Sequence, residues 1–345
     1  MAVYINGIGK VSPAMADASA VAVPLQPIPF SKMALEPNYE RWIDSKQLRR
    51  MSRVIRMGVA SGFTALQEAG IKVPDAIITG TGYGCKDDTG IFIRKMIEND
   101  ETALNPTPFI QSIHNSIGSQ IGLLLQARGY NQTYSHGAIS FETALMDALM
   151  TLDEYQEKNL LVGGVDEITE LSQRIINRFG TFRHHGANAD DAGMQVLHGE
   201  GAAFFSLSTK STSSSVCLAD VSTLHEPSAS ELNAEVERFL SANCLSAMDV
   251  DCVLPGISGI EKFDELVNDL LDKQFPSSSL VGFKHICGEY LTATGFAMHL
   301  AVEIMRGGNI PEAYALRDLA RKPSTMLIIN QYTGTYYSLI LLKAC

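Results

Sequence analysis

The sequence predicts a mixed α/β protein built from two similar halves. Short apolar runs that break at glycine, such as AVYINGIG (2–9), alternate with amphipathic helical stretches along the chain. Strands that alternate with helices are typical of α/β folds. A serine-rich stretch, STSSS (211–215), marks a joint, and beyond it the same order of elements repeats in outline. We therefore expect an internal duplication, with one half at 1–210 and the other at 211–345.

In the first half, the apolar stripe of 49–71 predicts a helix that stops at Gly70. The remaining elements expected there are a strand and glycine turn (75–88), a loop and helix (100–129), a helix starting near 133, and two strands (157–170 and 199–208). Those expected in the second half are a strand (216–223), a helix (230–242), a strand ending in Pro and Gly (249–258), a helix (262–274), a long apolar helix (290–308) and two strands around a turn (324–343).

Composition excludes several classes of function. The chain has 345 residues, 46% of them apolar and 19% charged, which suits a globular protein with ample core material. A net charge of −11 argues against nucleic acid and anionic membranes, because both require basic surfaces. The basic residues of 46–58 form a local exception, which we interpret as a solvated helix face or a patch for an acidic partner.

The six cysteines show no CxxC pair and no zinc-type spacing. Reduced, buried thiols in a cytoplasmic protein are the simplest interpretation. The start of the chain lacks a basic segment followed by an apolar run, so no secretory signal is expected. No apolar stretch is long enough to span a bilayer.

The segment TYSHGAISFETALMDAL (133–149) resembles a nucleophile site without the usual nucleophile. Its apolar residues recur at helical spacing, so Thr133 to His136 are expected where a helix begins. A helix N-terminus favours a developing anion and lowers a cysteine's pKa, yet no cysteine lies between Cys85 and Cys217. Ser135 could attack only with a base, and the adjacent His136 points about a hundred degrees away. The base would have to be His114, His225 or His285, and an N-cap is the simpler role for Ser135.

Two other motifs carry weaker signals. GTGYGC (80–85) follows a strand but lacks the third glycine and the ribose-binding acid of a dinucleotide site, so a packing turn is favoured. Adjacent carboxylates at Asp166 and Glu167 are expected to be solvated or capping. His184 and His185 lie together in a polar loop without a third spaced ligand, and we expect no metal or other cofactor.

Taken in order, five segments of the chain resemble the β-ketoacyl synthases, condensing enzymes of the thiolase fold. They are RRMSRVIRMGVASGFTALQEAGI, IITGTGYG, PFIQSIHNSIGSQIGLLLQARGYNQTYSHG, EKNLLVGGVDE with HGEGAAFFSLS, and FKHICGEYLTATGFAMHLAVEIMRGG. The resemblance covers nearly the whole chain and implies a five-layer αβαβα architecture from two duplicated halves. It also implies acyl chain assembly on a carrier protein.

Family members use a cysteine nucleophile and two histidines, and this chain departs from all three. The cysteine position falls on Ser135, and the histidine positions fall on Pro255 and Glu289, whereas Lys284 and Gly288 match the family pattern. Proline has no side-chain donor, and an ionised Glu289 would repel an oxyanion unless burial kept it protonated. Independent decarboxylative condensation is therefore not expected.

Within the family, such losses are known in chain-length-factor subunits, which pair with an active synthase and shape the acyl tunnel at the shared interface. The resemblance implies a non-catalytic partner of a ketosynthase in fatty-acid or polyketide-type assembly, with compact aryl-polyene pathway proteins as relatives. Candidates for tunnel or interface contacts, which could equally fill the core, are Phe109, Ile110, Ile113, His114, Ile117, Leu123 and His136. The alternatives are a Ser135-dependent acyltransferase or hydrolase, and a non-catalytic homodimer that binds acyl chains or an acyl carrier protein.

Overall fold

One large sheet organises the protein. The computed structural model describes residues 2–13, 31–155, 158–179, 196–212, 216–307, 312–317 and 322–345. The strands of the large sheet are β1 (Val3–Val11), β3 (Ala76–Gly80), β4 (Tyr130–Tyr134), β5 (Asn159–Asp166), β7 (Gly201–Ser208), β8 (Val216–His225), β9 (Cys252–Pro255), β10 (Ser279–Val281), β11 (Ala315–Arg317), β12 (Thr325–Tyr332) and β13 (Tyr336–Ala344). A separate two-stranded sheet pairs β2 (Ser31–Lys32) with β6 (His198–Gly199).

The helices cover both faces of this sheet. They are α1 (Ser45–Leu48), α2 (Arg53–Ala69), α3 (Lys86–Glu98), α4 (Pro106–Gln111), α5 (Ser116–Leu125), α6 (Ser140–Glu154), α7 (Glu170–Phe179), α8 (Ala229–Ala242), α9 (Glu261–Gln274), α10 (Lys284–Cys287) and α11 (Ala293–Met305). No helix in the described ranges has both the length and the apolar composition needed to cross a membrane.

The strand order shows the same arrangement twice. Five strands from the first part of the chain lie in the order β4-β3-β5-β7-β1, and five from the second part lie in the order β10-β9-β12-β13-β8, with the short β11 at the edge beyond β10. In each set the first three are parallel to one another, and the last two pair antiparallel. The sets meet where β1 pairs with β8. We propose that the duplicated halves divide between β7 and β8, as 1–210 and 211–345.

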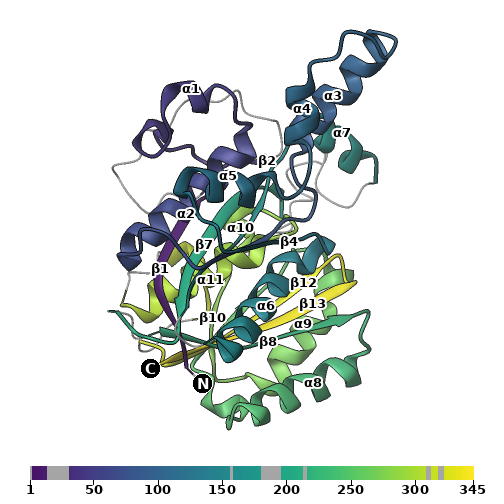
Figure 1. Ribbon diagram of the computed structural model, residues 1–345. Helices are drawn as coiled ribbons and strands as arrows, with labels where there is room; N and C mark the ends of the chain where they lie inside the picture. The colour runs from purple at the N-terminus through teal and green to yellow at the C-terminus, as the bar shows by residue number, and fades with distance from the viewer. Residues whose placement is uncertain are drawn as a thin grey trace.

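Three apolar clusters separate five layers. One lies between α2, α5 and the first set of strands, and another lies between α8, α9 and the second set. The largest contains α6 and α11, whose side chains pack against strands of both sets. Figure 1 shows α8 and α9 along one side of the molecule and α2 and α5 toward the opposite side. The layers are thus α, β, α, β, α, as the thiolase-type interpretation predicts.

Close backbone contact fixes the first strand against its helix. A Cβ atom on Gly7 would lie 2.0 Å from the Ala65 carbonyl oxygen, and one on Gly9 would lie 2.1 Å from that of Ser61. Both positions therefore require glycine for β1 to pack on α2. The expected end of this helix is confirmed, because Gly70 follows α2 in a left-handed conformation with φ 71°.

The expected helix start at Thr133 to His136 is wrong. Thr133 and Tyr134 belong to β4, which pairs in parallel with β3, and a short 3₁₀ turn (Gly137–Ile139) precedes α6 at Ser140. The helical spacing of the apolar residues starts inside the strand, so periodicity alone placed the boundary too early. The sequence interpretation also missed α3, whose acidic and apolar residues follow the glycine turn directly.

The expectation of six reduced thiols is wrong for one pair. Cys217 of β8 and Cys345 form a disulfide, because Lys343 pairs with Cys217 in the antiparallel ladder and brings the last residue alongside. The other four cysteines are free, three of them buried and Cys244 exposed. The loop that contains His184 and His185 lies outside the described residues.

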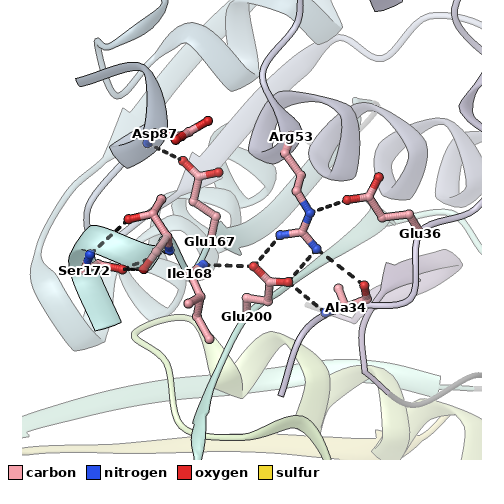
Figure 2. A network of polar contacts seen from close by, with 9 residues as sticks. Ala34, Glu36, Arg53, Asp87, Glu167, Ile168, Ser172 and Glu200 are labelled. Atoms are coloured by element: carbon pink, nitrogen blue, oxygen red, sulfur yellow. Dashed lines mark hydrogen bonds and ion pairs between the residues drawn. The ribbon is translucent and has the colours of Figure 1, made fainter. Parts of the chain in front are cut away.

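A buried ion-pair network joins distant segments of the first half. The guanidinium of Arg53, at the start of α2, bonds both carboxylate oxygens of Glu200 and one oxygen of Glu36 (Figure 2). Glu200 also accepts from the backbone N–H groups of Ala34 (2.8 Å) and Ile168 (2.9 Å). Glu200 is fully buried, so its charge depends on Arg53 for compensation.

Replacing Arg53 with alanine should lower the free energy of unfolding by about 3–5 kcal/mol, because the Glu200 carboxylate would remain buried without its cation. Chemical denaturation monitored by circular dichroism measures the change. Arg174→Ala is the matched control, since the Arg174–Glu170 pair is solvent-exposed and worth at most about 1 kcal/mol. Equal effects of the two substitutions would show that the Arg53 network does not hold these segments together.

Candidate functional site

Ser135 lies at the junction between β4 and the turn that precedes α6. Its side chain is exposed, and its hydroxyl donates a hydrogen bond of 3.3 Å to the backbone carbonyl of Gly82. The Gly82 position packs closely on Leu291, since a Cβ there would lie 2.1 Å from Leu291 Cδ1. The structure therefore brings together Ser135, the glycine turn after β3 and the segment that carries Glu289.

No described histidine activates Ser135. The ring of His114 packs against Gly84, and His136 lies beside Thr143, with its Nδ1 at 3.2 Å from the threonine hydroxyl. His285 lies at 2.9 Å from the carbonyl of Ala313, and His225 contacts the ring of Tyr336. In the described part of the chain, none has a nitrogen within hydrogen-bond distance of Ser135 Oγ. Ser135 thus has neither a base nor the N-cap hydrogen bond expected of it.

A buried carboxylate holds the glycine turn in place. Asp166, at the end of β5, accepts from the backbone N–H groups of Gly82 (3.0 Å) and Tyr83 (3.1 Å) and from the hydroxyl of Thr292 (3.0 Å). Burial raises its pKa, while these donors oppose the shift. Asp166 and Glu167 were expected to be solvated or capping, and both are buried. Strand-end position alone did not reveal that Asp166 organises the turn under Ser135.

Glu289 forms a buried ion pair with Lys284. The ammonium of Lys284 lies 2.6 Å from Glu289 Oε2 and also donates to the backbone carbonyl of Gln331. Both side chains are fully buried, and Glu289 Oε1 has no hydrogen-bond partner. Burial raises the pKa of Glu289 to about 7, and the adjacent Lys284 opposes this shift. The carboxyl is therefore directed at Lys284 rather than available to polarise a thioester oxygen.

Pro255 lies on the other side of this pair. It ends β9, and the next residue, Gly256, approaches both Asn330 and Lys284. A Cβ on Gly256 would lie 2.3 Å from Asn330 Oδ1 and 3.1 Å from Lys284 Cε. The structure thus brings together Pro255, Lys284, Glu289 and Asn330. The buried Asn330 Oδ1 also lacks a hydrogen-bond partner.

The sequence interpretation also missed the burial of Glu142. Glu142, on the inner face of α6, is fully buried and accepts from the Ser338 hydroxyl at 2.8 Å. Burial raises its pKa to about 7, with Ser338, Thr294 and Lys284 opposing the shift. A glutamate within the apolar spacing of 139–149 was the available signal. No group of three or more metal-ligating side chains was found among the described residues.

The tunnel and interface candidates divide into exposed and buried residues. Ile117 is fully buried against the core of the first half, close to Gly58, so it cannot touch a partner directly. His114 and His136 are exposed. The exposed apolar candidates are Phe109 (55%), Ile110 (62%), Ile113 (52%) and Leu123 (69%).

Part of the chain matches a known family. Residues 27–180, somewhat less than half of the sequence, match the beta-ketoacyl synthase N-terminal domain. No protein of curated function matches the sequence. Over its full length, the chain has the fold of several solved synthases, at identities that establish the fold alone.

Three of these structures illustrate the likeness, and the chain is covered completely in each. A beta-ketoacyl synthase from Burkholderia phymatum superposes with a TM-score of 0.80 at 15% identity over 99% of its length. A chain of the Xenorhabdus doucetiae complex between the ketosynthase ApeO and its chain length factor ApeC superposes with a TM-score of 0.78 at 12% identity over 98% of its length. The ishigamide ketosynthase/chain length factor superposes with a TM-score of 0.77 at 15% identity over 99% of its length.

The raised pKa of Glu289 predicts a specific pH dependence of stability. Between its ordinary value of 4.5 and about 7, the folded protein holds a proton that the unfolded chain releases. Protonated Glu289 therefore adds to the free energy of unfolding at low pH. This stabilisation falls by about 1 kcal/mol per pH unit as the pH rises from 4.5 and is lost at pH values above 7. Glu289→Gln should make the fall of the unfolding free energy between pH 5 and 7 shallower by about 1 kcal/mol per pH unit, while the raised pKa values of Glu142 and Glu167 keep their own share of the slope.

Denaturation at half-unit pH steps measures this slope. Glu98→Gln serves as the control, because the Lys95 ammonium lowers the pKa of that exposed carboxyl, which titrates below the window. An unchanged slope in Glu289→Gln would contradict the assigned environment of Glu289.

Proposed function

We propose that this protein is a non-catalytic, chain-length-factor-like partner of an active ketosynthase in fatty-acid or polyketide-type chain assembly, aryl-polyene pathways included. One observation carries the proposal. The three positions that would supply a thiolate and two imidazoles hold Ser135, Pro255 and Glu289, and Glu289 is bound to Lys284. A serine without an aligned base is a poor nucleophile. The site therefore lacks both the thiolate that would hold the acyl chain and the hydrogen-bond donors that would stabilise the oxyanion during condensation.

The surface around β4 supports a protein partner. This strand forms one edge of the large sheet and pairs only with β3 among the described strands. An unpaired edge presents free N–H and C=O groups to another chain. The apolar side chains of Ile110, Ile113 and Leu123 are exposed on the neighbouring segments. A groove of about 610 Å³ runs between α5 and β4.

A carrier protein is the second partner in this proposal. Lys46, Arg49 and Arg50 are exposed just before α2, whereas Arg53 turns inward to Glu200. Three exposed cations form a local basic patch on a chain of net charge −11, which suits an acidic partner. One solved structure with the same fold, at 13% identity, is a chain from the complex of a type II PKS acyl-carrier protein with its ketosynthase.

The other candidate functions lack a supporting contact. A Ser135 acyltransferase or hydrolase needs a base, and the described histidines make other contacts. A homodimer would use the same β4 edge, so the reconstitution below distinguishes it from a heterodimer. A cytoplasmic location also belongs to this proposal.

Ser135→Ala should leave product formation by a reconstituted ketosynthase pair within about twofold of the unmodified pair, because no step depends on the Ser135 hydroxyl. Product is measured by mass spectrometry after mixing both subunits with carrier-bound substrates. The partner synthase carrying an alanine at its nucleophile is the inactive control. If Ser135→Ala abolished product as completely as that control does, the partner-subunit proposal would be wrong.

Ile110→Asp and Leu123→Asp should each weaken association with the ketosynthase at least about tenfold, because each places a charge in a desolvated apolar contact. Analytical ultracentrifugation and co-purification measure association, and the circular dichroism spectrum should be unchanged. Met248→Asp is the control, since Met248 is 96% exposed and lies on a different part of the chain. Undiminished pairing in both variants would exclude this surface as the interface.

A further inference from the structure

Both ends of the segment that contains α3 and α4 stand on the glycine turn beside Ser135. The chain leaves this turn at Cys85, directly before α3, and returns to it after α4 at His114. A Cβ on Gly84 would lie 3.0 Å from the ring of His114, so the two ends of the segment meet. We name residues 86–111 the α3–α4 arm. The arm thus begins and ends at the carboxyl end of β3, next to the exposed Ser135.

The base of the arm is fixed to the body of the protein. Asp166 holds the glycine turn, and the neighbouring Glu167 accepts a hydrogen bond of 3.0 Å from the backbone N–H of Asp87. Asp88, also in the first turn of α3, is the one buried residue of that helix. The first turn of α3 therefore cannot move without breaking buried contacts.

The outer part of the arm is attached mainly to itself. Its two helices contact each other through the rings of Phe92 and Phe109, whose centroids lie 5.1 Å apart. Among the described residues, 90–107 form no hydrogen bond or ion pair with any residue outside the arm. Helix α4 has no buried residue, and Figure 1 shows the arm projecting from the rest of the molecule. A segment with few buried contacts moves more easily than the core.

Gly90 lies where the fixed turn of α3 gives way to the exposed part. Glycine weakens the interior of a helix, because its backbone has more freedom than that of any other residue. Packing does not require glycine at this position. A Cβ there would meet Leu171 Cδ2 at 3.6 Å, which is an ordinary van der Waals distance. The position therefore has the properties of a hinge between a fixed base and a unit that moves as one body.

We propose that the outer part of the α3–α4 arm is a lid that bends at Gly90 and closes over Ser135. The structure shows the open position, because Ser135 is exposed. Closure removes the exposed apolar side chains of Phe109 (55%) and Ile110 (62%) from water, which favours the closed position. This inference does not depend on the partner-subunit function, since the isolated chain contains every part of the lid.

Distance measurement by electron spin resonance on the isolated protein tests this motion. Spin labels are attached at Arg94→Cys, on the outer part of α3, and at Ser135→Cys. The background is Cys244→Ser, because Cys244 is an exposed free thiol. Two distance populations should appear, and the shorter one belongs to the closed lid. The control pair joins Ser135→Cys to Met248→Cys, which is 96% exposed and lies outside the arm, and it should give one population.

Gly90→Ala locates the hinge. Alanine fits at this position and favours a straight helix, so the ratio of closed to open populations should fall by about fivefold. Lys95→Ala is the matched control, because it replaces an exposed residue of the same helix that already favours helical backbone. It should leave the ratio within about twofold of the unmodified arm.

A single population for the Arg94–Ser135 pair, as narrow as that of the Met248 control, would show a rigid arm and overturn the proposal. Two populations that Gly90→Ala leaves unchanged would overturn it as well, because the arm would then move about another point.

Discussion

The ammonium of Lys284 is the interaction on which the arrangement of the site depends. It lies fully buried between the carboxylate of Glu289 and the backbone carbonyl of Gln331, so it joins α10 to strand β12. A buried charge must be compensated, and here the compensation uses the residue at a family histidine position. In the proposed function, this pair occupies a position where an active synthase would hold a hydrogen-bond donor. Pro255 and the exposed Ser135 complete a site without an activated nucleophile.

The proposed partner role rests on the surface as well as on the site. In the described part of the chain, β4 is an edge strand, and α4 and α5 carry exposed apolar residues. Arg53 and Glu200 fix the start of α2 in the interior. Exposed apolar residues on a well-ordered body are typical of a surface that binds another protein.

The sequence predicted most of the fold because its signals are local. Gly70 ended α2 where expected, and the repeated order of strands and helices matches the two similar strand orders. The break expected at Gly163 and Gly164 is wrong, because β5 continues through both glycines to Asp166. The assignment of Ser135, Pro255 and Glu289 to the family's nucleophile and histidine positions stays a prediction. The sequence could not predict the direction in which Glu289 points, the turn held by Asp166 or the buried Glu142. The last two features depend on contacts between residues 84 and 196 positions apart, and the direction of Glu289 depends on how the buried chain packs, which no periodicity encodes.

The central claim is that this protein carries no acyl group of its own during chain assembly. Intact-mass and peptide mass spectrometry after incubation with acyl-carrier thioesters, with and without a partner synthase, measures this directly. The account predicts acylation confined to the partner and product only when both subunits are present. A stoichiometric acyl adduct on Ser135 of the isolated protein would contradict it and would establish a serine acyltransferase.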